Sequence, residues 1–125
     1  MLGDREAIAT IAVRDINVAA KFYEQTLGLK PVPTKEKGVK GYKSGSSSVL
    51  VYTSQFAGTN KATAATWVVG ADVEKVVNEL KAKGVVFEHY DFPGVTLKGD
   101  VHVFGDLKNA WFKDPDGNIL SIVSG

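Results

Sequence analysis

Hydrophobic and polar residues alternate along the chain with two different periods, and the changes between them mark out the secondary structure. Residues 8–13 read as a short strand, and the apolar residues after Asp15 recur every three or four positions, as on one face of a helix. We expect Asp15 to cap this helix and Gly28 to end it. Three extended stretches follow, at residues 30–34, 39–43 and 48–53. The first half of the chain therefore predicts the order β-α-β-β-β.

The second half of the chain predicts a similar order. A strand at residues 65–69 leads to Asp72, which we expect to cap a second helix that ends at Gly84. The last two strands are joined by Asp-Pro-Asp-Gly at residues 114–117, a strong turn signal because proline fixes one φ angle and glycine accepts a positive one. The remaining strands of this half are expected at residues 85–88, 101–104, 109–113 and 118–123.

The apolar stripes of the two predicted helices superpose at one constant offset. Four positions of the first helix match four of the second, namely Ile16, Ala19, Ala20 and Tyr23 with Val73, Val76, Val77 and Leu80. Such self-similarity indicates a duplicated unit, with repeat one at about 7–53 and repeat two at about 64–123. We expect a single α+β domain over residues 1–125, in which two curved mixed sheets, each backed by one helix, surround a shared cup.

Composition and charge exclude several classes of protein. Of the 125 residues, 44% are hydrophobic and 10% aromatic, which is enough to bury a core. The formal net charge is +1 without a long basic stripe, so nothing favours a nucleic-acid partner. No cysteine is present for a disulfide or a thiol nucleophile, and the apolar runs are too short to cross a bilayer. We therefore expect a cytoplasmic protein that binds neither nucleic acid nor membrane.

Three motifs, in this order and spacing, carry a resemblance to a known family. They are Phe22–Leu29, which contains Phe-Tyr-x-x-x-Leu-Gly, then Gly84–Gly94, and Trp111–Leu120, which contains Asp-Pro-Asp-Gly-Asn. With the two β-α-β-β-β units, they make the whole chain similar to the vicinal oxygen chelate superfamily of glyoxalases, bleomycin-resistance proteins and extradiol dioxygenases. The resemblance implies a homodimer and a small-molecule ligand.

Enzymes of that family hold a divalent metal ion with His and Glu side chains at four positions. The flanking motifs place these positions at Ile8, Val51 (or Val49), Ala65 and Ser121. Aliphatic side chains offer no donor atom, and a lone serine hydroxyl is a weak ligand for a hard cation. We therefore expect no metal, no cofactor and none of the metal-dependent activities of the family.

Strand alternation then suggests which residues face the cup. If Ile8 and Ala65 face it, Thr10 and Trp67 do so too, and we expect the indole of Trp67 to stack on a planar ligand. Burial of Trp67 and Trp111 in the core is the alternative interpretation. The candidate ligand-binding residues are Thr10, Tyr52, Trp67, His102, Phe104, Trp111 and Ser121.

Three functions from different classes are compatible with these residues. The leading hypothesis is a protein that binds an aromatic or apolar small molecule and has no catalytic residues. The alternative is a metal-independent lyase or isomerase that uses His102, Tyr90 or Glu88 as acid or base on a small carbonyl or hydroxylated substrate. The third is a structural or protein-interaction module. His89, beside two carboxylates, is expected to form a solvated ion pair or a turn contact.

Overall fold

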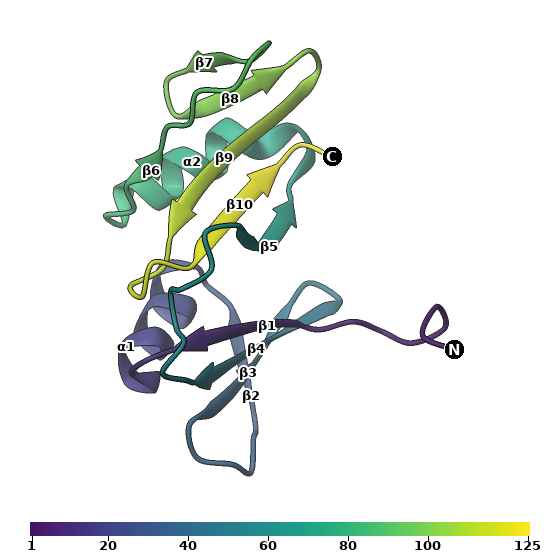
Figure 1. Cartoon of the computed structure of the whole chain (residues 1–125), viewed down its shortest axis with the longest axis vertical. Helices are drawn as coiled ribbons and strands as arrows, with labels where there is room; N and C mark the ends of the chain where they lie inside the picture. Colours follow the sequence, from purple (N-terminus) through teal and green to yellow (C-terminus); the bar gives the residue numbers. More distant parts are fainter. The chain divides into compact units, whose positions relative to one another are not determined.

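The computed structural model describes residues 1–125, which form two compact units, residues 1–59 and residues 60–125. Each unit consists of one β-sheet with a helix on one of its faces (Figure 1). This confirms the predicted α+β class. The single domain and the cup shared by the two halves stay predictions. No helix combines the length and the apolar character that a membrane crossing requires.

The first unit contains a four-stranded sheet in the order β1-β4-β3-β2. Its strands and helices, in chain order, are β1 Ala9–Val13, α1 Ile16–Lys21, a π-helical segment Phe22–Thr26, β2 Lys30–Val32, β3 Val39–Ser44 and β4 Ser47–Thr53. Strand β1 pairs with β4 in parallel, and the other neighbours are antiparallel. The predicted strands are therefore present, with ends that differ by one or two residues.

Helix α1 begins after Asp15, as predicted. The Oδ1 atom of Asp15 accepts hydrogen bonds from the backbone N–H groups of Asn17 at 2.9 Å and Val18 at 3.3 Å, which satisfies donors that have no partner inside the helix. The helix continues into the π-helical segment and stops at Gly28, whose φ of 76° is the left-handed conformation that favours glycine.

The core of the first unit lies between its helix and one face of its sheet. Ile11 pairs with Val51 across β1 and β4, and both are buried on this face. Tyr23, from the π-helical segment, stacks on Tyr42 of β3 with 6.2 Å between ring centroids. Val49 pairs with Tyr42 and is buried on the same face. Val49 and Val51 therefore face the helix, and the assignment of a former metal position to either of them is wrong.

Tyr42 makes this core sensitive to alkaline pH. Its hydroxyl donates to Glu24 Oε2 at 2.9 Å, and burial, followed by the hydrogen bond and charge of Glu24, raises the pKa of Tyr42 well above its ordinary value of 10.0. A raised pKa means that the unfolded chain loses this proton at a lower pH than the folded protein does. The stabilisation is complete below about pH 10 and is lost as the pH rises beyond it.

We therefore expect the melting temperature to fall between about pH 9 and 11, and to fall less steeply for Tyr42→Phe, which has no phenolic proton. Calorimetry over this range tests the difference in slope. Tyr52→Phe is the matched control, because Tyr52 is exposed on the other face of the sheet. Equal slopes for the Tyr42→Phe variant and the unmodified protein would contradict the assignment.

The second unit contains a six-stranded sheet, in which five strands follow the order β5-β10-β9-β8-β7 and the short β6 pairs with β9. Its elements are β5 Thr63–Val68, a 3-10 turn Gly70–Asp72, α2 Val73–Ala82, β6 Phe87–Glu88, β7 Thr96–Lys98, β8 Val101–Phe104, β9 Leu107–Lys113 and β10 Ile119–Val123. Strand β5 pairs with β10 in parallel, and the other pairs are antiparallel. Strand β7 was not predicted.

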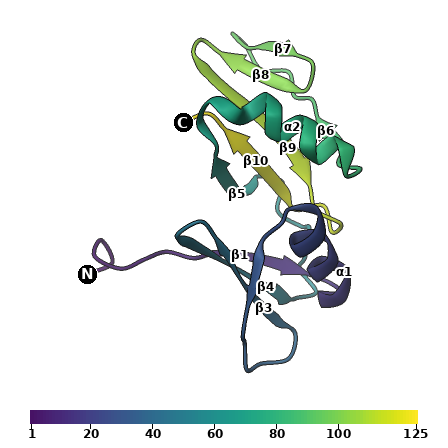
Figure 2. The same cartoon turned by 180° about the vertical axis from the view of Figure 1, so that it is seen from behind.

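Helix α2 lies on one face of this sheet, behind it in Figure 1 and in front of it in Figure 2. The buried side of α2 consists of Val73, Val77 and Leu80. Glu74 of α2 forms an ion pair with Lys108 of β9, with 2.6 Å between Oε1 and Nζ. Because residues two apart in a strand share a face, Ala110 and Phe112, both buried, lie on the same helix-covered face as Lys108.

The start of α2 corrects one prediction, and its end confirms another. The side chain of Asp72 makes no capping hydrogen bond, because Asp72 belongs to the 3-10 turn that precedes the helix. Gly84, with φ of 92°, stops the helix as predicted, and the backbone N–H of Val85 donates to the carbonyl oxygen of Leu80 at 3.0 Å.

Candidate ligand-binding site

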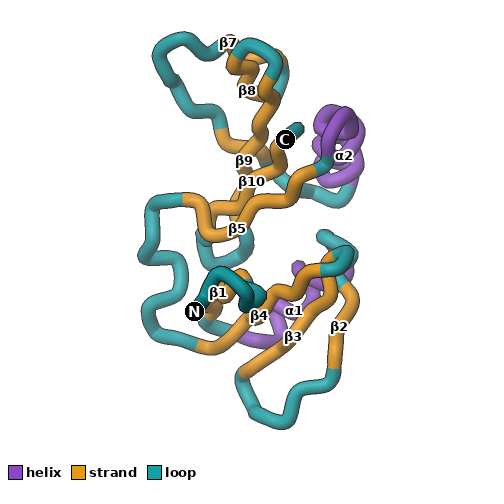
Figure 3. Tube along the Cα trace, turned by 90° about the vertical axis from the view of Figure 1, so that its right-hand side faces the viewer, coloured by secondary structure: helices purple, strands orange, loops and turns teal.

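The face of the second sheet opposite α2 brings together several residues with aromatic or polar side chains. His102 pairs with Asn109 across β8 and β9, and Trp111 pairs with Ser121 across β9 and β10. Asn109 and Trp111 alternate with the helix-facing Ala110, so all four side chains belong to the open face. The chain between β6 and β7 runs over this side of the sheet, while α2 covers the other (Figure 3).

An aromatic cluster covers part of this open face. Tyr90 and Phe92, from the chain between β6 and β7, lie 5.4 and 5.8 Å from Trp111 between ring centroids. Phe92 also contacts Phe104 of β8 at 6.1 Å. The ring of His102 meets the indole of Trp111 edge-on, at 4.9 Å and 80°. Aromatic rings in such tilted and T-shaped arrangements present apolar surface in a defined orientation.

His102 lies beneath these rings and is fully buried. Its Nε2 atom accepts a hydrogen bond of 2.9 Å from the backbone N–H of Tyr90. His102 therefore fixes the backbone of Tyr90 over the sheet. Three polar atoms of the second unit are buried without a hydrogen-bond partner, namely His102 Nδ1, Tyr90 Oη and Asn109 Oδ1. Buried polar atoms normally have hydrogen-bond partners, so these three unpaired atoms indicate a place where a bound molecule could supply polar groups.

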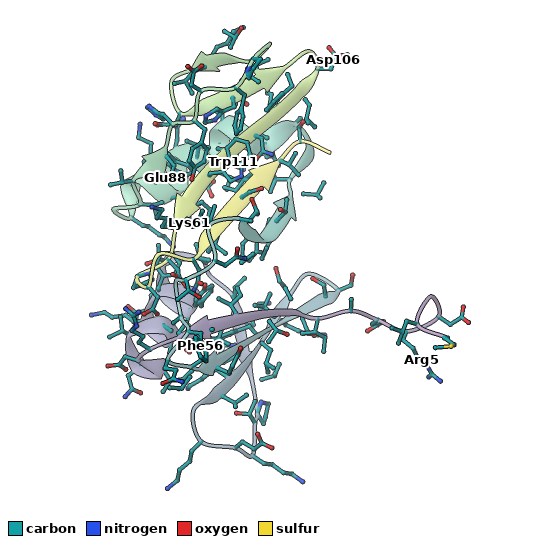
Figure 4. All side chains as sticks on the ribbon, in the orientation of Figure 1. Arg5, Phe56, Lys61, Glu88, Asp106 and Trp111 are labelled. Atoms are coloured by element: carbon teal, nitrogen blue, oxygen red, sulfur yellow. The ribbon has the colours of Figure 1, made fainter.

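A pocket of about 330 Å³ opens beside the aromatic cluster. Its lining residues are Lys61, Ala62, Thr63, Tyr90, Phe92, Trp111 and Ile119. The indole Nε1 of Trp111 donates to Thr63 Oγ1 at 3.2 Å, which holds the ring as one wall. Figure 4 shows Trp111 on the sheet and Lys61 on the segment that leads into β5. Small-molecule pockets begin at roughly 300 Å³, so this one suits a compact ligand.

The register of β5 corrects the placement of Trp67. Trp67 pairs with Ile122, whose neighbour in β9 is the helix-facing Ala110, so the indole lies on the face that α2 covers. Ala65 pairs with Leu120 and lies on that face too. The prediction that Trp67 lines the open side of the sheet is therefore wrong, and the alternative interpretation, a position on the core side, holds for this residue.

The remaining predicted residues fall into two groups. His102, Phe104, Trp111 and Ser121 lie on the open face of the second sheet, the first three in the aromatic cluster. Thr10 and Tyr52 lie on the open face of the first sheet, opposite the buried Ile11 and Val51. Their roles in ligand binding stay predictions.

The sequence interpretation missed Tyr90 and Phe92 as members of the aromatic cluster, and Lys61 and Thr63 as pocket residues. These residues lie at strand ends or in connecting segments without a regular period, so alternation says nothing about where they point. The available signal was the density of aromatic residues between Phe87 and Phe92. Tyr90 was considered only as an acid or base for the alternative enzymatic function.

Ser121, which the sequence motifs predict to occupy a metal-ligand position of the resembling enzymes, makes a hydrogen bond to a second hydroxyl. Its Oγ atom donates to Thr66 Oγ1 of β5 at 3.2 Å. The equivalent parallel pair in the first unit is Thr10 and Leu50. The alternation of the sequence had placed Ala65 and Val51 on the open faces of the two sheets. In the structure their neighbours Thr66 and Leu50 lie there. The structure contains no group of three His, Asp or Glu residues that could hold a metal ion.

The partner of His89 is a carboxylate distant in the sequence, and not one of the two carboxylates beside it. The Nε2 atom of His89 is 2.7 Å from Asp100 Oδ1, and Lys81 Nζ is 2.7 Å from Asp100 Oδ2. Lys81 first, and then His89, lowers the pKa of Asp100. The carboxylate of Asp100 therefore has two cationic or hydrogen-bonding partners on the protein surface.

A comparison with protein families decides the relationship of the chain. The model of the Glyoxalase/Bleomycin resistance protein/Dioxygenase superfamily matches residues 7–122. The chain belongs to this superfamily. The resemblance carried by the three sequence motifs is thereby confirmed. No curated protein matches the chain in sequence.

Solved structures of the same fold extend over nearly the whole chain. An integron cassette protein, HFX_CASS4, from the mobile metagenome of the Halifax Harbour sewage outfall has a TM-score of 0.72 at 14% identity, covering 98% of this chain and 99% of that one. Lactoylglutathione lyase from Agrobacterium tumefaciens has a TM-score of 0.70 at 17% identity, covering 96% of this chain and 92% of that one. The fosfomycin resistance protein FosX from Listeria monocytogenes has a TM-score of 0.72 at 15% identity, covering 96% of this chain and 92% of that one. These likenesses extend the superfamily assignment to the three-dimensional fold.

Proposed function

We propose that this member of the superfamily binds a planar, largely apolar small molecule on the open face of its second sheet, without a metal ion. The observation that carries the proposal is the pocket walled by Tyr90, Phe92 and Trp111. Aromatic side chains favour stacked or edge-on contact with a flat ligand, and burial of apolar surface contributes about 25 cal/mol per Å².

A second candidate is metal-independent turnover of the bound molecule, by a lyase or isomerase reaction. Tyr90 supports it, because burial, followed by the charge of Glu88, raises the pKa of its hydroxyl and keeps the proton in place. Tyr90 lines the pocket, and its buried, unpartnered hydroxyl can act as a general acid if the bound molecule reaches it. Analysis of every bound compound for product separates the two candidates: binding without product supports sequestration.

The two tryptophans of the chain allow a direct test, because they lie on opposite faces of one sheet. Trp67→Phe leaves Trp111 as the only indole, and Trp111→Phe leaves Trp67. Titration with a panel of neutral aromatic amides, beginning with the quencher 4-nitrobenzamide, should give saturable quenching of the Trp67→Phe variant. The Trp111→Phe variant should show only the linear quenching caused by collisions.

EDTA provides the control for a metal, and we expect it to leave the titration unchanged, because no residue that lines the pocket is a strong metal ligand. Circular dichroism checks that both variants are folded. The proposal fails if no compound of the panel gives saturable quenching through Trp111, or if saturation follows Trp67 instead. Loss of binding in EDTA that zinc or manganese restores would refute the metal-free part.

A further inference from the structure

Each polar side chain that lines the pocket can donate a hydrogen bond. The Lys61 ammonium group carries the only charge among the lining residues and can only donate. Thr63 Oγ1 already accepts from the indole of Trp111, which leaves its own hydroxyl proton to donate. Tyr90 Oη is buried without a partner. No lining residue is a carboxylate or a side-chain amide that would offer a matching acceptor.

The charges near the pocket do not cancel this preference. Glu88 is the carboxylate that acts on Tyr90, but it forms an ion pair with Lys113, with 3.3 Å between Oε1 and Nζ. Lys61 has no carboxylate within ion-pair distance. An uncompensated ammonium group at the mouth of an apolar pocket attracts anions, and a hydrogen bond to a charged acceptor is stronger than one to a neutral acceptor.

From this arrangement we infer that the ligand is an aromatic carboxylate, with its ring against the exposed surfaces of Trp111 and Phe92 and its carboxylate bound by Lys61 and the hydroxyl groups of Tyr90 and Thr63. The inference rests on the proposed function, since it assigns the ligand class of the same pocket. The apolar walls select the ring, and the three donors select the charge. His102 acts as a positioning residue, because its Nε2 atom holds the backbone of Tyr90.

A matched pair of probes tests the charge separately from the ring. In the Trp67→Phe background, 4-nitrobenzoate and its neutral amide, 4-nitrobenzamide, are titrated at pH 7 with the fluorescence of Trp111 as readout. The carboxylate should bind about tenfold more tightly than the amide, the difference expected of one charge-assisted hydrogen bond. Raising the NaCl concentration from about 0.05 to 0.5 M should weaken the binding of the carboxylate but not that of the amide, because salt screens exposed charges.

Three further substitutions assign the effect to its residues. Lys61→Gln, and separately Tyr90→Phe, should bring the affinity for 4-nitrobenzoate close to that for the amide and leave the affinity for the amide within about twofold. Lys98→Gln is the matched control, because Lys98 is an exposed lysine of β7 outside the pocket, and it should change neither affinity.

The outcomes separate the inference from the proposed function. If the amide binds as tightly as the carboxylate, or if Lys61→Gln leaves the preference intact, the ligand class is wrong while binding of aromatic molecules stands. If neither probe, nor any amide of the panel, quenches Trp111 saturably, the proposed function itself is overturned. A tenfold preference that disappears in Lys61→Gln and persists in Lys98→Gln supports both.

Discussion

Replacing Phe112 by alanine is expected to lower the free energy of unfolding by about 3–5 kcal/mol, the range for a large buried aromatic residue. Phe112 is 1% exposed on the helix-covered face of β9, and its ring lies 5.5 Å from that of Phe87 in a T-shaped contact. Strand β9 pairs with three other strands, so a cavity here would weaken the centre of the second sheet. Urea or guanidinium unfolding measures the change.

Val68→Ala is the control for this prediction. If Trp67 faced the open side, as the alternation of the sequence suggested, its neighbour Val68 would face the helix and this change would lower the stability. In the structure Val68 is 69% exposed and pairs with Val123 on the other face, so we expect a change within about 0.5 kcal/mol. A loss for Phe112→Ala no larger than that for Val68→Ala would show that the helix-covered core has been placed on the wrong face.

Asp114→Ala is expected to cost about 2–4 kcal/mol, because the carboxylate of Asp114 is a buried hydrogen-bond acceptor for the whole turn. Its Oδ1 atom accepts from the backbone N–H groups of Asp116 at 3.0 Å and Asn118 at 2.9 Å, and Oδ2 accepts from Asn118 Nδ2 at 2.8 Å. Alanine removes all three bonds and leaves the buried amide of Asn118 without this partner.

The conservative variant Asp114→Asn provides a comparison for the loss of stability in Asp114→Ala. Its side-chain oxygen can still accept from the two backbone groups, so the loss should be clearly smaller than for alanine. Thermal unfolding of both variants measures the order. Equal losses for the two variants would mean that the side chain of Asp114 acts through its charge or through Asn118 alone, and not through the backbone of the turn.

The helices and most strands could be predicted because their patterns of apolar and polar residues repeat over enough positions to be recognised. Asp15, the stop at Gly28 and the turn at residues 114–117 each act within a few residues, so local sequence determines them. Strand β7 has three exposed residues and pairs only with β8, and such a segment carries no alternating pattern of burial. Its existence depends on a tertiary contact.

The assignment of strand residues to the two faces of a sheet was wrong where it relied on aligning the two repeats by their helices. Thr10 beside Leu50 corresponds to Thr66 beside Ser121, whereas the alignment based on the helices had matched Thr10 with Trp67. The 3-10 turn before α2 and the irregular pairing near Ile119 shift the register relative to that alignment. A shift of one position exchanges the two faces of a strand, so Trp67 and Ala65 were both placed on the wrong side.

The candidate pocket was only half predictable for a related reason. Trp111 and His102 lie in regular strands, whose alternation can be followed. Tyr90 and Phe92 reach the same face from a connecting segment that is held by the hydrogen bond between His102 and the backbone of Tyr90. This contact joins residues twelve positions apart, so it depends on the folded chain. The sequence around Tyr90 contains no pattern that predicts it.

The 3-10 turn between β5 and α2 also determines where this chain can tolerate a change in length. Gly70 has a φ of 60°, and the space beside its Cα atom, where a side chain would begin, has no neighbouring atom within 4 Å. A residue added here lies after the end of β5 at Val68, so it does not change the alternation of side chains within that strand. The same insertion within β5 would exchange the environments of every later side chain in the strand. We therefore expect an insertion at this junction to disturb the two faces of the sheet less than an insertion within β5 does.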